Sequence, residues 1–290
     1  MNIFARKIKA SMEILITNDD GIQSDGIKAL VEAMRPYGNL TIVAPKYHQS
    51  GMSMAVSMGF KPIAVKEIKR TENQRWIYVD GTPSSCIKYG LDMVMKDRKP
   101  DVVISGINHG ANAATAVLYS GTLGATKEAA IAGIPAIGVS LDHMSFNADF
   151  STVVKMFPAI FDKIMANLGQ KKGVYYNINF PYLKENEIKG IRVAHQGSIR
   201  WDNEFVDFDP GIYDKLGVTP QQLGITSLPE LEEGETRYMM AGELKNNDND
   251  HTSDNILLEN GYITIVVHNT DTTDYGEIER LKSLEFDREF

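Results

Sequence analysis

The sequence contains a single cysteine, Cys86, among its 290 residues, and its apolar runs are short. One cysteine excludes an internal disulfide framework, and a membrane-spanning helix would need about 20 consecutive apolar residues. Residues 1–11 lack the apolar stretch of a secretory signal, and we treat them as an N-terminal extension. These features predict a cytoplasmic protein with no membrane partner.

Several widespread catalytic and nucleotide-binding motifs are missing as well. No segment reads G-x-G-x-x-G or G-x-x-x-x-G-K-[ST], and there is no G-x-S-x-G segment. The sequence therefore offers no support for the usual dinucleotide site, the P-loop or the nucleophile elbow of serine hydrolases. The six histidines show no zinc-type spacing and have no cysteine partners, which argues against a zinc site.

The chain has fewer basic residues than acidic residues. The chain carries 30 basic and 38 acidic residues, for a net charge of −8. A protein that binds duplex nucleic acid needs clustered cations to meet the phosphate backbone, so this partner is not expected. Residues 1–185 nevertheless carry a basic surplus, whereas residues 186–290 are strongly acidic. We therefore expect an anionic small substrate to bind to the first part of the chain.

From residue 12 onward, short apolar runs alternate with segments of helical character. The predicted strands are 13–17, 40–43, 101–104, 136–139 and 174–178. The predicted helices between and around them are 24–37, 83–95, 120–132 and 150–168. Near-continuous apolar strands are usually buried on both faces of a parallel sheet. The alternation predicts an α/β protein with a Rossmann-like, doubly wound and mostly parallel sheet.

Two parts of the sequence depart from this alternation. Residues 62–68 and 76–79 read as two extended runs, which predict an inserted hairpin that makes an antiparallel excursion. After residue 185 the alternation fades, so we expect a main domain over 12–185 and a smaller, irregular C-terminal subdomain with an acidic tail over 186–290. Within it, the polar segment 243–253 is expected to be a mobile loop.

Polar residues follow three of the predicted strands. They are Asn18-Asp19-Asp20-Gly21, then Gln49-Ser50-Gly51, then Asn108-His109-Gly110-Ala111-Asn112. Ligands of open α/β sheets bind outside the carboxyl ends of the strands. Adjacent carboxylates repel unless a cation or a proton intervenes, and oxygen donors of this kind suit Mg²⁺ or Mn²⁺. The alternative is that Asn-Asp-Asp-Gly is an ordinary turn, since all of these residue types favour turns.

A fourth segment, Tyr119-Ser120-Gly121-Thr122, leads into the predicted helix 120–132. The free amides and positive dipole at a helix start can bind phosphate, and the hydroxyls of Ser120 and Thr122 would add donors. A plain serine or threonine N-cap explains the same residues equally well. His109 lies within the third polar strand end and is a candidate auxiliary residue, although a lone histidine in a loop is more often a bystander.

Six sequence blocks, taken together, resemble the survival protein E (SurE) nucleotidase family. The resemblance covers about residues 12–267 and is strongest through residue 141. The blocks are Ile-Thr-Asn-Asp-Asp-Gly-Ile at 16–22, Val-Ala-Pro at 43–45 with Gln-Ser-Gly at 49–51, Asp-Gly-Thr-Pro at 80–83, Ser-Gly-Ile-Asn-His-Gly-Ala-Asn at 105–112, Tyr-Ser-Gly-Thr at 119–122 and Gly-Tyr-Ile-Thr-Ile at 261–265.

The resemblance implies a phosphomonoesterase that hydrolyses nucleoside 5′- and 3′-monophosphates with a metal-activated water. It implies one Mg²⁺ or Mn²⁺ ion per subunit, and a C-terminal region that forms a homodimer or homotetramer. The implied metal ligands are Asp19, Asp20, Ser50 and Asn108, of which Asp19, Asp20 and Asn108 would also be catalytic. The positions implied near the phosphate are Asn112, Ser120, Gly121 and Thr122, with Asn18 and His109 as possible auxiliaries.

Two other functions stay open. Residues 113–116, Ala-Ala-Thr-Ala, replace a stretch that in the family usually holds glycine and an acidic residue, so the chain could be a non-catalytic module that binds metal and nucleotide. A phosphatase with an aspartyl-phosphate intermediate also begins with an aspartate after its first strand. By resemblance, such enzymes carry an Asp-x-Asp motif. This motif is missing here, because Gly21 lies two residues after Asp19 and Ile22 lies two residues after Asp20.

Overall fold

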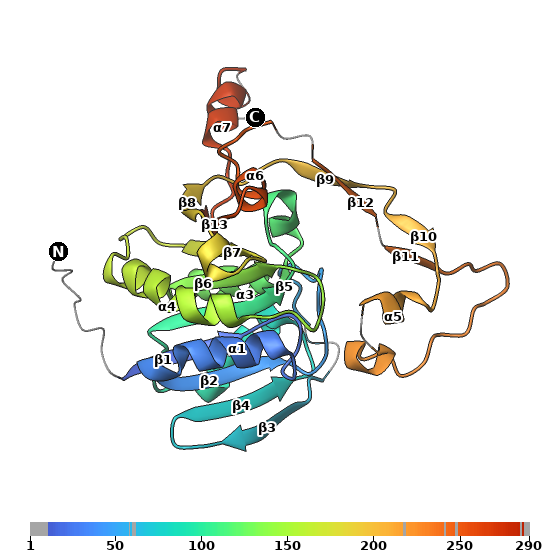
Figure 1. The fold of residues 1–290 in the computed structure, drawn as a ribbon, viewed down its shortest axis with the longest axis horizontal. Helices are drawn as coiled ribbons and strands as arrows, with labels where there is room; N and C mark the ends of the chain where they lie inside the picture. The colour runs from blue at the N-terminus through green and yellow to red at the C-terminus, as the bar shows by residue number, and fades with distance from the viewer. Residues whose placement is uncertain are drawn as a thin grey trace.

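The computed structural model describes residues 11–57, 59, 62–216, 219–240, 242–246, 249–284 and 286. Its centre is a nine-stranded sheet in the order β3-β4-β2-β1-β5-β6-β7-β13-β8 (Figure 1). The six strands from β4 to β7 in this order run parallel to one another, so the predicted fold class is confirmed. The five strands predicted from the sequence are β1 (Met12–Thr17), β2 (Gly38–Pro45), β5 (Val102–His109), β6 (Ala136–Asp142) and β7 (Val174–Pro181).

Helices cover both faces of the sheet, as a doubly wound fold requires. α1 (Asp25–Met34) and α4 (Ser151–Ala166) lie on the face toward the viewer in Figure 1, and α2 (Pro83–Tyr89) and α3 (Gly121–Ile131) on the other. All four predicted helices are therefore confirmed, and serine side chains cap the start of two of them. Ser24 accepts a hydrogen bond from Ile27 N, and Ser120 accepts one from Leu123 N. In the described part of the chain, no helix has both the length and the apolar character needed to cross a membrane.

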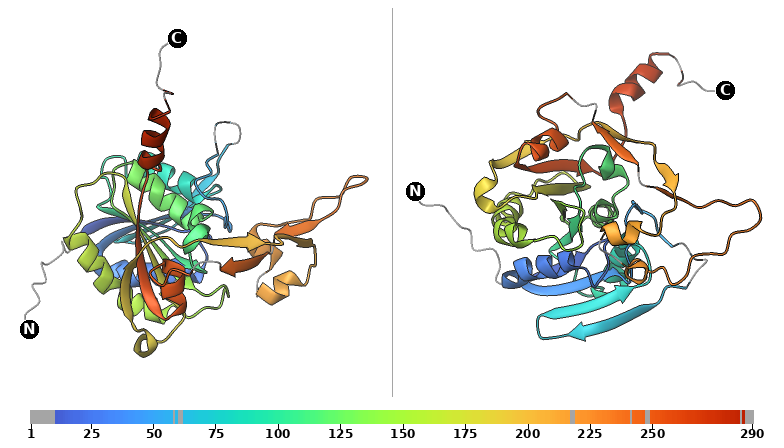
Figure 2. Two further views of the ribbon diagram at one scale, coloured as in Figure 1. Left: turned by 90° about the horizontal axis from the view of Figure 1, so that it is seen from above. Right: turned by 45° about the vertical axis from the view of Figure 1, so that its right-hand side comes forward.

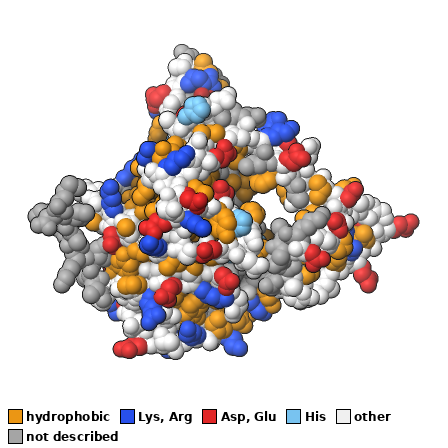
Figure 3. All heavy atoms as spheres, viewed as in Figure 1, with side chains coloured by type: hydrophobic (Ala, Val, Ile, Leu, Met, Phe, Trp, Pro, Cys, Tyr) orange, Lys and Arg blue, Asp and Glu red, His pale blue; other side chains and the backbone are white. Residues whose placement is uncertain are grey.

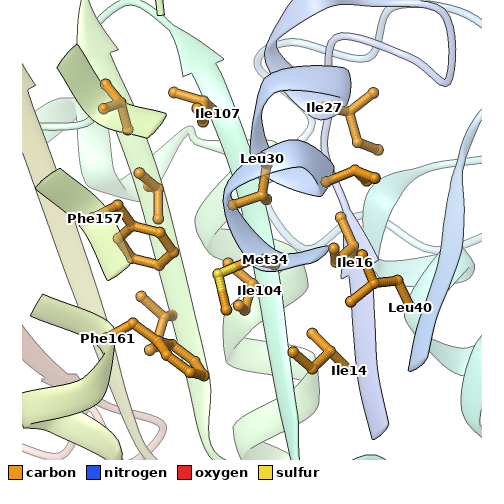
Figure 4. Packing of buried hydrophobic residues seen from close by; sticks show 14 of the residues in the cluster. Ile14, Ile16, Ile27, Leu30, Met34, Leu40, Ile104, Ile107, Phe157 and Phe161 are labelled. Carbon is orange, nitrogen blue, oxygen red and sulfur yellow. The ribbon is translucent and has the colours of Figure 1, made fainter. Parts of the chain in front are cut away.

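Each central strand contributes side chains to two hydrophobic cores, one on either face of the sheet. In β1, Ile14 and Ile16 join the core under α1 and α4, while Leu15 between them joins the core under α2 and α3. Successive side chains of a strand point to opposite faces, so a continuous apolar run is what a doubly covered strand needs. Figure 4 shows the first core, in which α4 contributes Phe157 and Phe161.

The inserted hairpin is present and its two strands pair antiparallel as predicted, but it belongs to the main sheet and is no excursion from it. β4 (Gln74–Val79) runs parallel beside β2, and β3 (Val65–Arg70) pairs with β4 in the antiparallel direction at the sheet edge. The prediction was wrong on this point because β4 carries inward-facing apolar residues, including Trp76 and Ile77, that extend the two cores. Burial of these residues draws the hairpin into the main sheet.

Two strands from beyond residue 185 complete the sheet. β13 (Tyr262–Asn269) pairs antiparallel with β7, and β8 (Gly190–Ala194) runs parallel beside β13. The sheet therefore continues past residue 185, and the division of the chain into domains there stays a prediction. α6 (Asp254–Glu259) precedes β13, and α7 (Tyr275–Lys282) follows it and stands away from the body (Figures 1 and 2).

Between β8 and α6 the chain forms a long projection, which we call the arm (the described residues 199–216, 219–240 and 242–246). In the arm, β9 (Ile199–Asp202) pairs with β12 (Glu243–Asn246), and β10 (Phe205–Asp207) pairs with β11 (Tyr238–Met240). The short helix α5 (Ile212–Leu216) lies in the connection between β10 and β11. Figure 2 shows the arm extending from the body, and Figure 3 shows acidic side chains along it.

The arm also corrects the prediction of a loop over residues 243–253. Residues 243–246 form strand β12 because they pair with β9, a partner more than 40 positions earlier in the chain. A local reading of polar composition cannot detect such a distant partner. Residues 247 and 248 lie outside the described part of the chain, and whether the remainder of 243–253 is mobile stays a prediction.

The strand order reverses at β1. The chain passes from β1 outward to β2 and β4, and then crosses to β5 on the other side of β1. The connections that leave β1 and β5 run to opposite faces of the sheet, and ligands of doubly wound proteins bind at such a switch point. Asn18-Asp19-Asp20-Gly21 follows β1 at this point, and Asn108 and His109 end β5.

Close packing of α1 on the β5 segment yields a stability prediction. A Cβ atom on Gly26 of α1 would lie 2.0 Å from the carbonyl oxygen of Ile107. Gly26→Ala should therefore lower the free energy of unfolding by about 1–3 kcal/mol, although alanine is the better helix former by about 1 kcal/mol. Urea unfolding measures the change.

The matched control is Gly276→Ala in the exposed helix α7. A Cβ atom there would make only an ordinary contact at 3.4 Å, with Asp274 Oδ1. The variant should therefore unfold at the same urea concentration as the parent protein or at a slightly higher one. A Gly26→Ala protein as stable as the parent would contradict the close approach of α1 to β5.

Candidate functional site

Asp19 is buried at the end of β1, only 3% exposed, and the start of α3 rests against it. Thr122 Oγ1 donates a hydrogen bond of 2.5 Å to Asp19 Oδ1. A Cβ atom on Gly121 would lie 2.9 Å from Asp19 Cβ and 3.0 Å from Asp19 Oδ2. Glycine at this position thus allows the helix start and the carboxylate to approach closely. The structure brings together three of the predicted residues, Asp19, Gly121 and Thr122.

Asp20 is also buried, and it faces two histidines. Its Oδ2 accepts hydrogen bonds from His109 twice, at 3.2 Å from the backbone N and at 2.9 Å from the ring Nδ1. Its Oδ1 lies 3.4 Å from His48 Nδ1, but it has no hydrogen-bond partner in the described part of the chain. A buried carboxylate oxygen without a donor is costly, and it marks a place for a cation.

The two adjacent carboxyl groups have pKa values shifted in opposite directions. Burial and the neighbouring charge of Asp20 raise the pKa of Asp19 to about 6, although the hydrogen bond from Thr122 opposes the shift. Burial alone would also raise the pKa of Asp20, but the hydrogen bond from His109 and the nearby His48 ring outweigh it and lower the pKa to about 2. With these pKa values the pair holds one proton, on Asp19, below about pH 6, and above that pH a bound cation would offset the charge of the second carboxylate.

The other predicted metal ligands lie on the neighbouring segments. Ser50 is exposed on the loop after β2, and the preceding residue, Gln49, donates its backbone N–H to the carbonyl oxygen of Asp19 at 2.7 Å. Asn108 is buried, and its Nδ2 donates to the carbonyl oxygen of Gly110 at 2.8 Å. That bond uses the amide nitrogen of Asn108 and leaves the amide oxygen as a donor atom for a cation.

The described residues fit a hard divalent cation. Nowhere among them do three or more His, Cys, Asp or Glu side chains group as a metal site. A cation held by Asp19 and Asp20 would therefore complete its shell with amide, hydroxyl and water oxygens, a donor set that Mg²⁺ and Mn²⁺ accept and zinc seldom uses. That Asn108 and Ser50 supply such oxygens from the next two strand ends stays a prediction.

The remaining predicted residues hold the surrounding backbone. Ser120 caps α3, and Asn112 donates from Nδ2 to Ser140 Oγ at 2.9 Å. Asn18 donates to the carbonyl oxygen of Gly21 and to Ser24 Oγ, so it ties the Asp-Asp turn to the start of α1. A direct contact of Asn112, Ser120, Gly121 or Thr122 with phosphate stays a prediction.

The sequence interpretation missed several residues that shape the site. Asn177 and Asn179 of β7 are fully buried, and both donate to the backbone carbonyl oxygen of Asn112. Asp254 of α6 accepts the backbone N–H of Ala114. The alternation Asn177-Ile178-Asn179 within an apolar strand was a usable sign, because two polar residues on one face of a buried strand require partners. Asp254 lies 140 positions from Ala114 and had no local sign.

The opposite pKa shifts predict opposite stability effects in metal-free protein. A carboxyl group with a raised pKa contributes stability below pH 4 and loses it as the pH rises through about 6. Asp19→Asn should therefore raise the free energy of unfolding at pH 8, by an amount on the order of 2 kcal/mol. At pH 4 the gain should vanish. Urea unfolding in the presence of a chelator measures both values.

Asp20→Asn provides the control of opposite sign. Its lowered pKa contributes stability above pH 4 that is lost only as the pH falls through about 2, so this variant should be less stable than the parent protein at pH 8. Equal destabilisation by both substitutions at pH 8 would contradict the opposite shifts.

Comparisons with known proteins point to one family. Residues 14–203 match the family model described as Survival protein SurE. A 5′-nucleotidase SurE of Christiangramia forsetii is 39% identical over 271 residues, which cover 93% of this chain and 95% of that protein. A 5′-nucleotidase SurE of Cytophaga hutchinsonii is 37% identical over 90% of this chain and 92% of its own length.

A solved structure extends the likeness to three dimensions. The crystal structure of the SurE protein from Aquifex aeolicus matches with a TM-score of 0.73 and 30% sequence identity, over 94% of this chain and 99% of that chain. The resemblance carried by the six sequence blocks is thereby confirmed, and the chain belongs to the SurE family.

Proposed function

We propose that this protein hydrolyses nucleoside 5′- and 3′-monophosphates to nucleoside and phosphate, with a divalent metal ion as cofactor. The observation that carries the proposal is the pair Asp19 and Asp20. Each carboxylate has one oxygen held by a protein donor, Thr122 for Asp19 and His109 for Asp20. The names of the curated relatives, 5′-nucleotidase SurE, support the same activity.

One Mg²⁺ or Mn²⁺ ion per subunit would be held by Asp19, Asp20, Ser50 and Asn108. An ion bound there lowers the pKa of a water ligand and neutralises the charge of a phosphoryl group. Asp19, Asp20 and Asn108 are the catalytic residues in this proposal. The free oxygens available to the ion are Asp19 Oδ2 and Asp20 Oδ1, because Asp19 Oδ1 and Asp20 Oδ2 are held by their donors.

The start of α3 provides the phosphate position. The first amides of any helix have no acceptor within the helix, and here the Ser120 side chain takes that of Leu123. The amides of Gly121 and Thr122 can therefore donate to phosphate oxygens, and the helix dipole favours the negative charge. Asp19 lies against the same helix start, so the phosphate binds there only when a cation offsets the carboxylate charge.

The acidic C-terminal region, 186–290, provides the contacts of a homodimer or homotetramer in the cytoplasm. Large apolar side chains on the arm and on α7 support this assembly, because exposed apolar groups of this kind mark interfaces. Phe205 of β10, Met240 of β11 and Tyr275 of α7 are each at least 66% exposed.

A substrate panel run with and without chelator tests the proposed function. Nucleoside monophosphates should be hydrolysed with Mn²⁺ or Mg²⁺, and removal of the metal should lower the rate at least about 100-fold. Asp20→Asn should lower kcat/KM by a similar factor, since it removes a charged ligand that the ion needs. Phosphate release measures both effects.

Asp25→Asn is the matched control. Asp25 lies exposed in the first turn of α1, where it pairs only with Lys28 in the described structure, so this variant should keep kcat/KM within about twofold. Full activity in chelator would overturn the metal requirement. Thermal stabilisation by nucleotide without phosphate release would identify a binding module in place of an enzyme.

A further inference from the structure

Two groups of His109 lie within hydrogen-bond distance of the same carboxylate oxygen of Asp20. Its backbone N–H lies 3.2 Å from Asp20 Oδ2, and its ring Nδ1 lies 2.9 Å from the same atom. The side chains of both residues are nearly inaccessible, at 3% and 1% exposure. A carboxylate oxygen can only accept, so Nδ1 is the donor in this contact. Together the two bonds fix the rotation of the carboxylate about its own axis.

The imidazole ring is itself held in place by two aromatic side chains. Phe146 stacks on it with ring centroids 5.1 Å apart and an interplanar angle of 24°, and Phe150 meets it edge-on at 5.0 Å. Within the described structure, the other ring nitrogen, Nε2, is buried and has no hydrogen-bond partner. The ring therefore directs its one polar contact toward Asp20.

A ring that served only to fill space would not need the polar atoms of an imidazole. An aromatic filler between Phe146 and Phe150 needs no polar atom, and a phenylalanine would fill the same space without burying an unpaired Nε2. Burial of an imidazole with one unpartnered nitrogen carries a desolvation cost. The bond from Nδ1 to Asp20 is the contact that offsets this cost.

We infer that His109 is a positioning residue for the cation site: it holds Asp20 Oδ2 so that Asp20 Oδ1 is presented to the metal ion. This inference rests on the proposed function, because it assumes that Asp20 is a metal ligand. Partners that orient metal ligands affect metal affinity by about 10–100-fold. His48, the second histidine near Asp20, lies farther away at 3.4 Å and is less buried, so it exerts weaker control over the carboxylate.

Two substitutions of His109 separate the donor from the ring. His109→Phe keeps an aromatic ring between Phe146 and Phe150 but removes the donor. His109→Asn loses the ring but places an amide nitrogen close to the position of Nδ1. Binding of Mn²⁺ alone to the full-length protein is measured by the paramagnetic resonance signal of the free ion, and circular dichroism checks folding.

The expected result is a loss of Mn²⁺ affinity of about 10–100-fold in His109→Phe, with affinity kept within about threefold in His109→Asn. Parent-like affinity in His109→Phe would overturn the inference. Equal losses in both variants would also overturn it, because they would assign the effect to the ring and not to the donor.

A third variant keeps the test decisive if His109→Phe does not fold. Phe146→Leu removes the stacking partner but leaves the donor, and it should keep Mn²⁺ affinity within about threefold; a tenfold loss there would overturn the inference. Failure of the parent protein itself to bind Mn²⁺ is a separate outcome, which refutes the proposed metal site on which the inference rests.

Discussion

The repulsion between two buried, adjacent carboxyl groups is the constraint on which this site depends. Asp19 and Asp20 follow one another at the end of β1, and both are less than 10% exposed. In a region of low dielectric, two such charges cannot persist side by side without compensation. Hydrogen bonds from Thr122 and His109 stabilise one oxygen of each carboxylate. The remaining negative charge needs either a proton or a cation.

The fold provides the compensation at one point in space. Because the strand order reverses at β1, the ends of β1 and β5 open beside each other, and the loop after β2 and the start of α3 both contact Asp19. The ends of β1 and β5, the loop after β2 and the start of α3 are distant in sequence, and they meet around the two carboxylates. Burial of apolar residues in the cores on either face of the sheet offsets the free-energy cost of burying two carboxylates. The same cores hold the strand ends in place.

Much of this arrangement could be predicted from the sequence. The five central strands, the four main helices and the N-cap Ser120 follow from local periodicity and capping chemistry, and the polar strand ends predict the cation site that we propose. What could not be predicted depends on distant partners. The hairpin joins the sheet through Trp76 and Ile77, residues 243–246 become a strand through β9, and the two histidines near Asp20 meet it only after folding.

The most direct measurement is the anomalous diffraction signal of crystals soaked in Mn²⁺. The account predicts one peak per subunit, with oxygen atoms of Asp19, Asp20 and Asn108 at about 2.1–2.3 Å from it, and with Asp20 Oδ1 rather than Oδ2 as the ligand atom. A peak elsewhere, or the absence of a peak at these residues in crystals that hold Mn²⁺, would contradict it.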